Sequence, residues 1–352
     1  MAAGKHSWLL AAGLRLSVVG LLAGWLTGCE PREAMPEKAG RDSGVVTDGA
    51  RVAAAEEVPP VRVVSWNVRE VFNDADRAAR AGDFRQFGND LKPDVLVLQE
   101  ITDPAVVKQM LGDMGLGGYY LAMSNFRQGD TTGHDDFEVA IASRWPLSGV
   151  VEFDPSPDNE PGDTPEKKLV APPLEGLKTP MTARGFLTAR IDAVKLVVIG
   201  THLKSSSGRV GMEDWKNSQQ REFIAAAMAA EVSRARKADD TVTVIVAGDF
   251  NVAAADKRKV GSSLVVDNPA DPAASDGYDE THALVGGGLV SGLRMINLAD
   301  GIRRSSYPSY PSPSPIDVIY VSGPGEGAFS PAVLGNTTYG SDHLPILTVM
   351  KR

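Results

Sequence analysis

The chain of 352 residues contains a single cysteine, Cys29. One cysteine excludes an internal disulfide bond and argues strongly against a cysteine-ligated zinc site. Basic residues are also in the minority, because 36 Lys and Arg stand against 45 Asp and Glu, for a formal charge of −9. This balance argues against a protein that grips nucleic acid through bulk release of counterions. It leaves room for one that holds such a ligand through metal ions and a local basic strip.

The most apolar stretch lies near the amino terminus, at residues 16–26, and Lys5 and Arg15 precede it. It is about half as long as a membrane-spanning helix requires. The stretch ends in Leu26-Thr27-Gly28-Cys29, which resembles the lipobox of bacterial lipoproteins, where cleavage leaves the cysteine as the lipidated first residue. We expect a lipoprotein-type signal peptide over residues 1–28 and lipidation at Cys29, with an ordinary signal peptide as the alternative. The protein would then be extracytoplasmic and anchored to a membrane of the cell envelope, periplasmic or outer.

Residues 29–60 have almost no large apolar side chains and are rich in Ala, Glu, Gly, Arg and Asp. Such a stretch cannot bury enough surface to offset the entropy lost on ordering, so we predict a flexible tether. Residues 61–352 are expected to form one catalytic domain. Hydrophobic residues make up 43% of the chain and charged residues 23%, which is ordinary for a folded globular protein.

Short β-branched runs recur through this domain and predict strands. The predicted strands are residues 61–66, 94–99, 137–143, 185–191, 195–200, 241–247, 316–322 and 344–349. Most are apolar at nearly every position, the pattern of strands covered on both faces. Residues 213–237 form the strongest helix candidate, because large apolar residues recur there at roughly helical spacing: Trp215, Phe223, Met228 and Val232. Two of the strands form a predicted hairpin, so the pairing is mixed and a two-sheet α/β sandwich is favoured.

Polar residues follow or flank several of these apolar runs. The set comprises Asn67, Glu100, His202, Asp249, Asn251, Asp317, Asp342 and His343. Strand ends hold side chains rigidly at the rim of a sheet, so we expect these residues to converge. Taken singly, an Asp or Asn there is most often a turn or cap residue, and a lone His is more often structural than catalytic. These eight residues fall in six separate motifs at strand ends, and their chemistry is complementary. This combination favours a catalytic site.

The residue types suit one kind of chemistry. A hard divalent cation such as magnesium prefers carboxylate and amide oxygens and leaves positions for water and a substrate phosphate. Such oxygens come from Asn67, Glu100, Asp249, Asn251 and Asp342. His202 and His343 can donate hydrogen bonds to a phosphate, and Asp317 is the natural carboxylate partner of His343. Asp249 and Asn251 would point the same way in an extended chain and hold a water or metal between them.

These motifs resemble those of the endonuclease/exonuclease/phosphatase superfamily, which includes pancreatic-type deoxyribonucleases, exonuclease-III-type repair enzymes, inositol polyphosphate 5-phosphatases and bacterial sphingomyelinases. They occur in the family's order: Ser65-Trp66-Asn67-Val68, Leu98-Gln99-Glu100, Ala142-Ser143-Arg144-Trp145-Pro146, Thr201-His202-Leu203-Lys204, Gly248-Asp249-Phe250-Asn251, Ile316-Asp317-Val318-Ile319 and Ser341-Asp342-His343-Leu344-Pro345. Each motif is weak alone, but the ordered set covers nearly the whole domain. The resemblance implies a four-layer α/β/β/α sandwich with two mixed β-sheets.

Position by position, the resemblance implies Glu100 as the main metal ligand, with Asn67 and Asp342 nearby. Asp249 would orient or deprotonate the attacking water, and Asn251 would bind phosphate or metal. The residues implied to contact the scissile phosphate, or to support that contact, are His202, His343 and Asp317. Magnesium is the expected cofactor, with Mn²⁺ as the next candidate and Ca²⁺ less favoured.

The substrate is less closely defined by the sequence. His202 stands where the repair enzymes usually carry asparagine, which places the chain nearer the deoxyribonuclease, sphingomyelinase and phosphatase branches. Thr102 stands where pancreatic-type deoxyribonucleases carry an arginine that enters the minor groove, so that contact is not expected. Lys204, with Arg144 and Arg184, is predicted to form a local phosphate-binding strip, and a solvated loop is the alternative for Lys204.

An extracytoplasmic nuclease acting on DNA or RNA therefore ranks first. A phosphatase or phosphodiesterase on small or lipid-linked substrates, inositol phosphate phosphatase-like or sphingomyelinase-like, ranks next. The alternative of another class is a binding module that has kept the fold and lost catalysis. No protein partner is implied, and a monomer is expected.

Overall fold

The computed structural model describes residues 59–126, 137–154, 166–170, 184–206, 214–253, 279–288, 290, 292–308 and 315–352. All of them belong to one compact unit, Glu56–Arg352. Within this part of the chain, every helix is too short or too polar to cross a bilayer. The predicted signal peptide, Cys29 and almost all of the predicted tether lie outside the described residues, so lipidation and localisation stay predictions.

Two mixed β-sheets form the centre of the domain. The first sheet has the strand order β12-β13-β1-β2-β4-β3. Its strands are β1 (Val61–Val71), β2 (Val95–Ile101), β3 (Tyr120–Met123), β4 (Glu138–Ser143), β12 (Val333–Leu334) and β13 (Ile346–Met350). The second sheet has the order β10-β11-β9-β8-β7-β5-β6. Its strands are β5 (Ser148–Asp154), β6 (Glu166–Leu169), β7 (Phe186–Ile191), β8 (Leu196–His202), β9 (Thr243–Asp249), β10 (Ile296–Asn297) and β11 (Asp317–Ser322).

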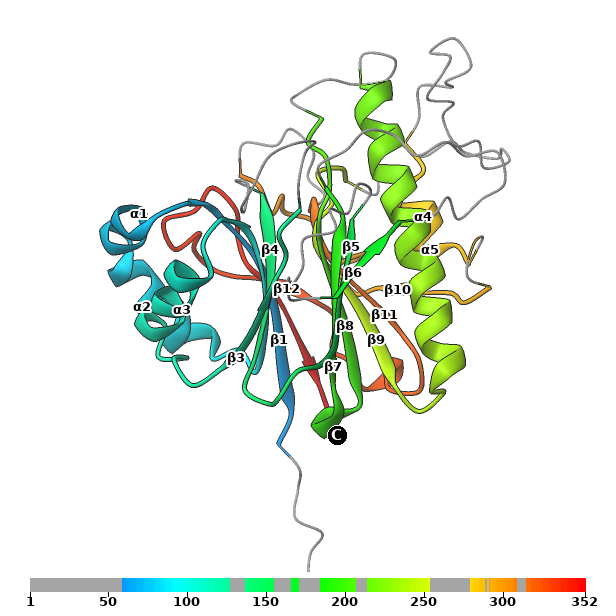
Figure 1. Cartoon of the computed structure of the whole chain (residues 1–352), viewed down its shortest axis with the longest axis horizontal. Coiled ribbons are helices and arrows are strands. Elements are labelled where there is room, and N and C mark those ends of the chain that lie inside the picture. The colour runs from blue at the N-terminus through cyan, green and yellow to red at the C-terminus, as the bar shows by residue number, and fades with distance from the viewer. Residues whose placement is uncertain are drawn as a thin grey trace, which may run out of the picture. The chain divides into compact units, whose positions relative to one another are not determined.

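Helices cover the outer face of each sheet, which gives the expected four layers (Figure 1). The helices on the first sheet are α1 (Asp74–Ala79), α2 (Ala81–Leu91) and α3 (Pro104–Asp113), and those on the second are α4 (Trp215–Ala238) and α5 (Thr281–Gly286). Local sequence sets where the first-sheet helices begin. Asn73 and Asp103 each accept two backbone N–H groups as N-caps, and Pro104 occupies the first turn of α3, where its missing N–H costs no helical hydrogen bond. The α/β/β/α prediction is confirmed.

Three hydrophobic layers hold this sandwich together, and strand alternation assigns side chains to them. In β1, Val63 packs between the two sheets, whereas Val64 and Trp66 pack under the helices. In β2, Val97 likewise packs between the two sheets and Leu98 packs under the helices. Successive side chains of a strand point to opposite faces, so a strand covered on both faces is apolar at every position. The third layer lies between the second sheet and α4, where Phe223, Met228 and Val232 are buried as predicted.

Strand direction brings the polar motifs to one end of the sandwich. β1 is parallel to β2 and β8 is parallel to β9, so each pair of strands ends at one edge of its own sheet. A hydrogen bond from Asn67 at the first edge to Asp249 at the second brings the two edges together. β13 runs antiparallel to β1 and β11 runs antiparallel to β9, so the motifs at their beginnings reach the same edge. We call this end, at which β1, β2, β8 and β9 finish, the catalytic edge. It is uppermost in Figure 1.

All eight predicted strands and the long helix exist, with boundaries that differ by a few residues. The predicted hairpin is the antiparallel pair β7 and β8. The sequence did not predict the edge and near-edge strands β3, β5, β6, β10 and β12. These strands are short or partly exposed, as in β6 with the sequence Glu-Lys-Lys-Leu, and none has the long apolar run of a covered strand.

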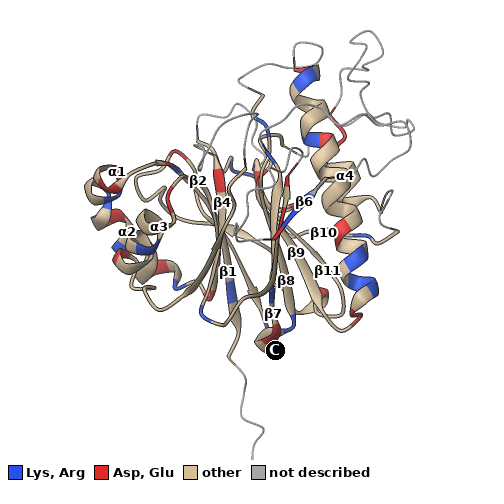
Figure 2. Ribbon diagram, in the orientation of Figure 1, with Lys and Arg blue, Asp and Glu red and all other residues tan. Residues whose placement is uncertain are grey.

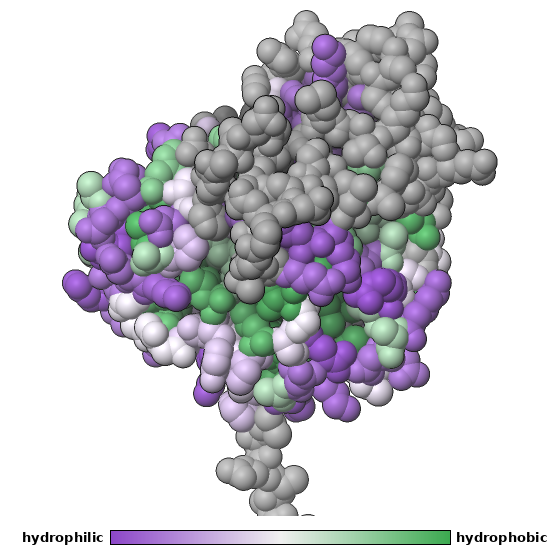
Figure 3. All heavy atoms as spheres, in the orientation of Figure 1, coloured by the Kyte–Doolittle hydropathy of each residue, from purple (hydrophilic) through white to green (hydrophobic). Residues whose placement is uncertain are grey.

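The surface follows from the layering. In the view of Figure 3, hydrophobic residues gather in the middle of the face, between the two sheets, with hydrophilic residues on either side. Figure 2 shows Asp and Glu near the upper ends of strands, at the catalytic edge. Buried carboxylates there include Glu138 and Asp249. An acidic end of this kind suits cation binding better than direct contact with polyanions.

Candidate active site

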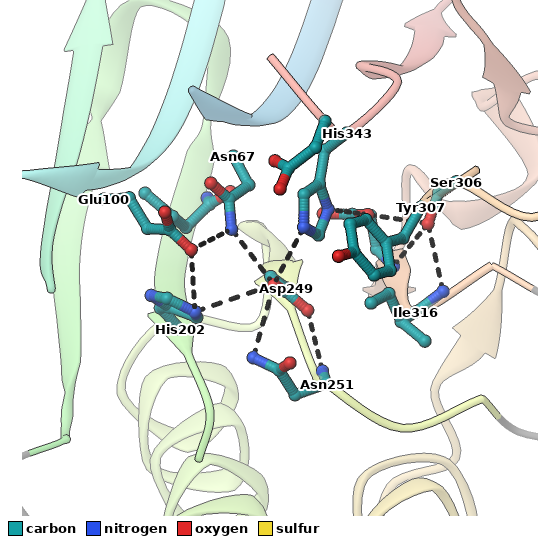
Figure 4. Close-up of polar contacts among 12 residues, drawn as sticks. Asn67, Glu100, His202, Asp249, Asn251, Ser306, Tyr307, Ile316 and His343 are labelled. Carbon is teal, nitrogen blue, oxygen red and sulfur yellow. Dashed lines mark hydrogen bonds and ion pairs between the residues drawn. The ribbon is translucent and has the colours of Figure 1, made fainter. Parts of the chain in front are cut away.

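Asp249 stands at the centre of the polar residues that converge at the catalytic edge (Figure 4). Its side chain is 1% exposed. Oδ1 accepts a hydrogen bond from the backbone N–H of Asn251 at 2.7 Å, and Oδ2 accepts from Asn67 Nδ2 at 3.1 Å. Nε2 of His202 lies 3.6 Å from Oδ2, and Nε2 of His343 lies 3.8 Å from it. Burial, and next the charge of Asp317, raise the pKa of Asp249 to about 7, which suits a general base at neutral pH.

Asn67 joins the two sheets at this point. Its Nδ2 donates to Oε1 of Glu100 at 2.8 Å as well as to Asp249, and its side chain is fully buried. Oδ1 of Asn67 accepts from the backbone N–H of Arg69 at 3.0 Å. One amide therefore holds a carboxylate of each sheet in a fixed relation, a role that needs both donors of the amide group.

His202 is neutral at physiological pH. Burial, then the positive charges of Arg184, His343 and Lys204, lower its pKa well below the usual value. Its Nδ1 is buried without a partner in the described part of the chain, so the proton of the neutral ring belongs on Nε2. That nitrogen faces Asp249 and also lies 3.8 Å from Oε1 of Glu100. His202 thus presents an N–H donor toward the centre of the site.

His343 differs from His202 in that its ring is protonated. Its Nδ1 lies 2.8 Å from Oδ2 of Asp317, the predicted partner. Burial lowers the pKa of His343, but Asp317 and Asp249 together outweigh it and raise the pKa to about 10. The ring is therefore an imidazolium with Nδ1–H directed to Asp317 and Nε2–H directed toward Asp249. Two imidazoles of different charge face one carboxylate, a pattern that places acid and base functions side by side.

Asn251 joins the group by a route that differs from the predicted one. β9 ends at Asp249, and Asn251 has φ 56°, in the left-handed region, so the segment is a turn and not an extended chain. Its Nδ2 donates to the carbonyl of Leu203 at 2.9 Å and to Oδ2 of Asp249 at 3.3 Å. Asn251 therefore braces Asp249 from a turn, where Asn tolerates positive φ better than most residues.

Strained backbone concentrates around this cluster. Of the seven non-glycine residues with positive φ among those described, five lie at or next to the site: Arg69, Glu70, Glu100, Asn251 and Tyr339. Glu100 itself has φ 62°. Such conformations persist only where the surrounding structure enforces them, and they collect at functional sites.

The chain matches the model of the endonuclease/exonuclease/phosphatase family over residues 64–343. The chain belongs to this family. The match spans every element that contributes a catalytic-edge residue, from Asn67 to His343. Members of the family are hydrolases that act on phosphoester bonds, and this protein is one of them. No curated protein matches the chain in sequence.

Solved structures share the fold at low identity. An endonuclease/exonuclease/phosphatase protein from Beutenbergia cavernae is 18% identical, with a TM-score of 0.50 over 83% of this chain and 71% of that one. A variant of the 3′ phosphatase NExo from Neisseria, bound to a product DNA hairpin, is 18% identical, with a TM-score of 0.51 over 83% of this chain and 100% of that one. A humanized D. rerio TDP2 is also 18% identical, with a TM-score of 0.51 over 83% and 99%.

The family depends on divalent metals, and the donor chemistry of this chain fits one. Glu100 and Asp342 supply carboxylates that are 18% and 34% exposed, with the Asn67 amide beside Glu100. Asp342 is placed by its neighbour Ser341, whose Oγ donates to the carbonyl of Asn67 at 2.8 Å. Partly exposed oxygen ligands leave room for water and phosphate, as a magnesium-type ion requires.

A second group could also hold an ion. Ligand atoms of Asp249, Asp317 and His343 all lie within 4.8 Å of one another, and all three side chains are buried. Here, however, Asp317 and His343 are hydrogen-bonded to each other, and the imidazolium form of His343 has no lone pair for a metal. The Glu100 side of the site is therefore the better candidate.

Two of the three predicted phosphate-binding cations lie beside His202. Arg184 is buried, and its Nη1 donates to the carbonyls of His202 and Leu203 at 3.3 and 3.1 Å. Lys204 follows on the same segment, half-buried, and burial and then Arg184 lower its pKa. Arg184 therefore holds the backbone at the end of β8 through these two carbonyls, whereas Lys204 remains a candidate for direct contact with phosphate.

The prediction for Arg144 was wrong. Arg144 pairs with Asp94 at 2.7 Å, and Asp94 precedes β2, whereas Glu100 lies near its end. β4 is antiparallel to β2, with Ser143 opposite Val95, so Arg144 lies about 17 Å of strand length from the catalytic edge. The serine-arginine-x-proline turn stabilises the opposite end of the first sheet.

Sequence reasoning missed several residues that contact the cluster. Tyr307 stacks on His343 with ring centroids 4.9 Å apart, and Phe137, 37% exposed, packs edge-on against His202 at 6.0 Å. Ser306 donates to Asp317. Phe137 directly precedes β4, whereas Ser306 and Tyr307 lie between β10 and β11, and none of the three belongs to a recognised motif. A signal existed for Phe137 alone, as an aromatic residue at the start of the predicted strand 137–143.

Proposed function

We propose that this protein is an extracytoplasmic, magnesium-dependent nuclease that hydrolyses phosphodiester bonds with water. The observation that carries the proposal is the environment of Asp249, a buried carboxylate with a pKa near 7 that two imidazoles and two amides surround. Such a group can take a proton from water while the donors around it stabilise the charge that develops on phosphate.

The two histidines divide the remaining work. His202, neutral with its proton on Nε2, donates a hydrogen bond to a non-bridging oxygen. His343, held as an imidazolium by Asp317, can donate to the phosphate or give its proton to the departing oxygen. Glu100, Asp342 and Asn67 would hold a divalent metal, which would supply Lewis-acid stabilisation of charge on the phosphate. No side chain needs to form a covalent bond to the substrate.

Nucleic acid is the favoured substrate because donors that suit a phosphodiester lie beside features that suit a nucleotide. Lys204 offers a cation next to His202, and Phe137 offers a partly exposed ring 6.0 Å from the same imidazole. Aromatic rings that stack bases and cations that hold the backbone are the usual parts of single-strand binding. The Neisseria 3′ phosphatase with a related fold was solved with a product DNA hairpin, which supports DNA as a ligand that such a fold accommodates.

The predicted lipoprotein signal over residues 1–28 is the basis for the cellular part of the proposal. Cleavage before Cys29 and lipidation there would anchor the catalytic domain to the envelope through residues 30–60. The acidic total charge gives no general attraction to polyanions, so affinity would come from the metal and local cations. We propose a monomer without a protein partner.

A phosphatase or phosphodiesterase on small or lipid-linked substrates is the second candidate, because the same catalytic groups would serve to hydrolyse either kind of ester. A sphingomyelinase would need an apolar surface to enter lipid. The exposed large apolar residues among those described are scattered over the fold: Tyr120, Phe137, Ile296 and Val333. This distribution favours a soluble substrate.

The deciding experiment uses the full-length chain in detergent with plasmid DNA, single-stranded DNA, RNA, bis(p-nitrophenyl) phosphate and sphingomyelin, in Mg²⁺, Mn²⁺ or chelator. We expect nucleic-acid cleavage that chelator abolishes and that the His202→Ala variant loses. Oligonucleotide products would support the nuclease. Release of orthophosphate or turnover of the lipid without DNA cleavage would assign the protein to the second candidate. Nucleic-acid binding without turnover of any ester would leave the binding module.

A further inference from the structure

Ser306 forms a buried hydrogen-bond centre behind the catalytic residues. The residue is fully buried, and its Oγ donates to Oδ2 of Asp317 at 2.6 Å. The same hydroxyl accepts from the backbone N–H groups of Ile316 and Asp317, both at 3.0 Å. With its proton committed to the carboxylate and its oxygen to two amides, the hydroxyl has one orientation only.

The backbone of Ser306 reaches the second catalytic segment. Its carbonyl accepts from the N–H of Leu344 at 2.7 Å, directly after His343. Ser306 thus ties the start of β11, which carries Asp317, to the segment that carries His343. Oδ2 of Asp317 then accepts hydrogen bonds from both the Ser306 hydroxyl and Nδ1 of His343.

The next residue secures the imidazole from its face. The ring of Tyr307 is tilted by 27° to the ring of His343, with centroids 4.9 Å apart. In Figure 4 the tyrosine ring lies alongside the imidazole, opposite Asn67 and Glu100. One dipeptide therefore restrains the carboxylate by a hydrogen bond and the imidazole by stacking.

We propose that Ser306 is a positioning residue for the reaction and acts through Asp317. By fixing the rotamer of the carboxylate, it fixes the orientation of His343, so that Nδ1–H stays on Asp317 and Nε2–H faces the reacting phosphate beside Asp249. Oδ1 of Asp317 is buried and has no partner among the described residues. The Ser306 hydroxyl is therefore the donor, besides His343 itself, that restrains this side chain. The inference rests on phosphoester hydrolysis and holds for any substrate of that class.

The first test measures turnover of bis(p-nitrophenyl) phosphate with Mg²⁺. Loss of a hydrogen bond to a buried charged group corresponds to a decrease in kcat of about tenfold or more in Ser306→Ala. KM and the magnesium affinity should stay unchanged, because Glu100 and Asn67 are untouched. Ser306→Thr keeps the hydroxyl and should recover most of kcat. Ser305→Ala is the matched control, since the Ser305 hydroxyl donates to the backbone carbonyl of Tyr307 and, among the described residues, makes no hydrogen bond to Asp317 or His343.

A double-mutant cycle separates positioning from general support of the fold. If Ser306 acts through Asp317, then Ser306→Ala should cause little further loss of kcat in the Asp317→Asn background. An equal loss in both backgrounds would overturn the proposal, as would equal losses in Ser306→Ala and Ser306→Thr.

The closing experiment needs no substrate, so its outcome is independent of whether the protein is a nuclease. NMR of the histidine-¹⁵N-labelled protein without metal reports the Nδ1 proton of His343. We expect a downfield, slowly exchanging Nδ1 proton in the wild type and in Ser306→Thr, and its loss or marked upfield shift in Ser306→Ala. An unchanged resonance in a folded Ser306→Ala protein would overturn the proposal.

Discussion

Oδ2 of Asp317 lies 2.8 Å from Nδ1 of His343, on a carboxylate that is fully buried and an imidazole that is 7% exposed. The two residues come from the start of β11 and from the segment before β13, so the pair joins the two sheets at the catalytic edge. A buried carboxylate and imidazole stabilise each other mainly as an ion pair. The pair therefore links stability to pH.

The metal-free protein should lose stability as pH rises through the alkaline range. The pKa of His343 is about 10 in the folded protein, above its ordinary unfolded value of about 6.5. The folded state then binds more protons than the unfolded state between these values. The contribution of His343 is complete below the unfolded pKa and is lost as pH rises toward about 10. The measurement is the free energy of unfolding in urea at pH 6 and pH 9, in chelator.

The matched variant for this prediction is His343→Asn, which keeps a polar side chain without a titrating ring. The difference in the free energy of unfolding between wild type and variant should shrink from pH 6 to pH 9. A difference that stays constant over this interval would mean that His343 titrates normally in the folded protein.

Glu100→Gln should remove metal binding with little change to the fold. The glutamine can still accept from Asn67 at Oε1, the contact that Glu100 makes at 2.8 Å, but it lacks the charge that a divalent cation requires. We expect the magnesium affinity, measured by calorimetry, to decrease at least about tenfold, with loss of turnover. Glu70→Gln is the control, since Glu70 is an exposed neighbour. Equal magnesium affinity in the wild type and in Glu100→Gln would place the metal elsewhere.

Arg144→Ala and Arg184→Ala should behave differently although both were predicted to bind phosphate. The Arg144 side chain is 49% exposed in its ion pair with Asp94, so its loss should cost at most about 1 kcal/mol of stability and leave kcat unchanged. Arg184 holds two carbonyls of the His202 segment, so its loss should cost about 1–3 kcal/mol and lower kcat. Thermal unfolding and turnover of bis(p-nitrophenyl) phosphate check both. A reduced kcat in Arg144→Ala would restore the original prediction.

The contrast between these arginines shows where sequence reasoning stops. Unbroken apolar runs predict the strands that are covered on both faces, and residues such as Asn67 and Asp249 lie at the ends of those runs. The direction of β4 relative to β2 leaves no mark in the sequence. Arg144 therefore has a side chain that suits phosphate, but it lies at the end of the sheet opposite the catalytic edge.

Arg144 was predicted to lie in the site and lies elsewhere, whereas Ser306 was not predicted and contacts the catalytic residues. It lies in a segment rich in Ser and Pro, without apolar periodicity, so nothing local distinguishes it from Ser305. Its role arises only when the chain returns through β11 and places Asp317 against its hydroxyl. Contacts of this kind depend on tertiary structure, and composition or spacing cannot reveal them.

Arg80 should support metal binding without touching the metal. Its Nη1 donates to the carbonyls of Val68 and Arg69 at 2.6 and 2.9 Å, and its Nη2 donates to the carbonyl of Tyr339 at 3.5 Å. The first two residues follow Asn67, and Tyr339 precedes Asp342 by three residues. One guanidinium thus ties together the two segments that carry candidate metal ligands.

The backbone at the end of β1 is strained, so its conformation depends on contacts such as those from Arg80. Arg69 has φ 52°, a conformation that only surrounding contacts maintain. In Arg80→Ala we expect this segment to relax and the magnesium affinity to decrease about tenfold, with Arg80→Lys intermediate because it lacks the planar fork. Arg77→Ala is the control, since Arg77 lies in α1, the helix that Arg80 caps at its C-terminus, and pairs with Asp74 and Asp113. If Arg80→Ala binds magnesium as tightly as Arg77→Ala does, then Asn67 and Asp342 are held in place by their other contacts alone.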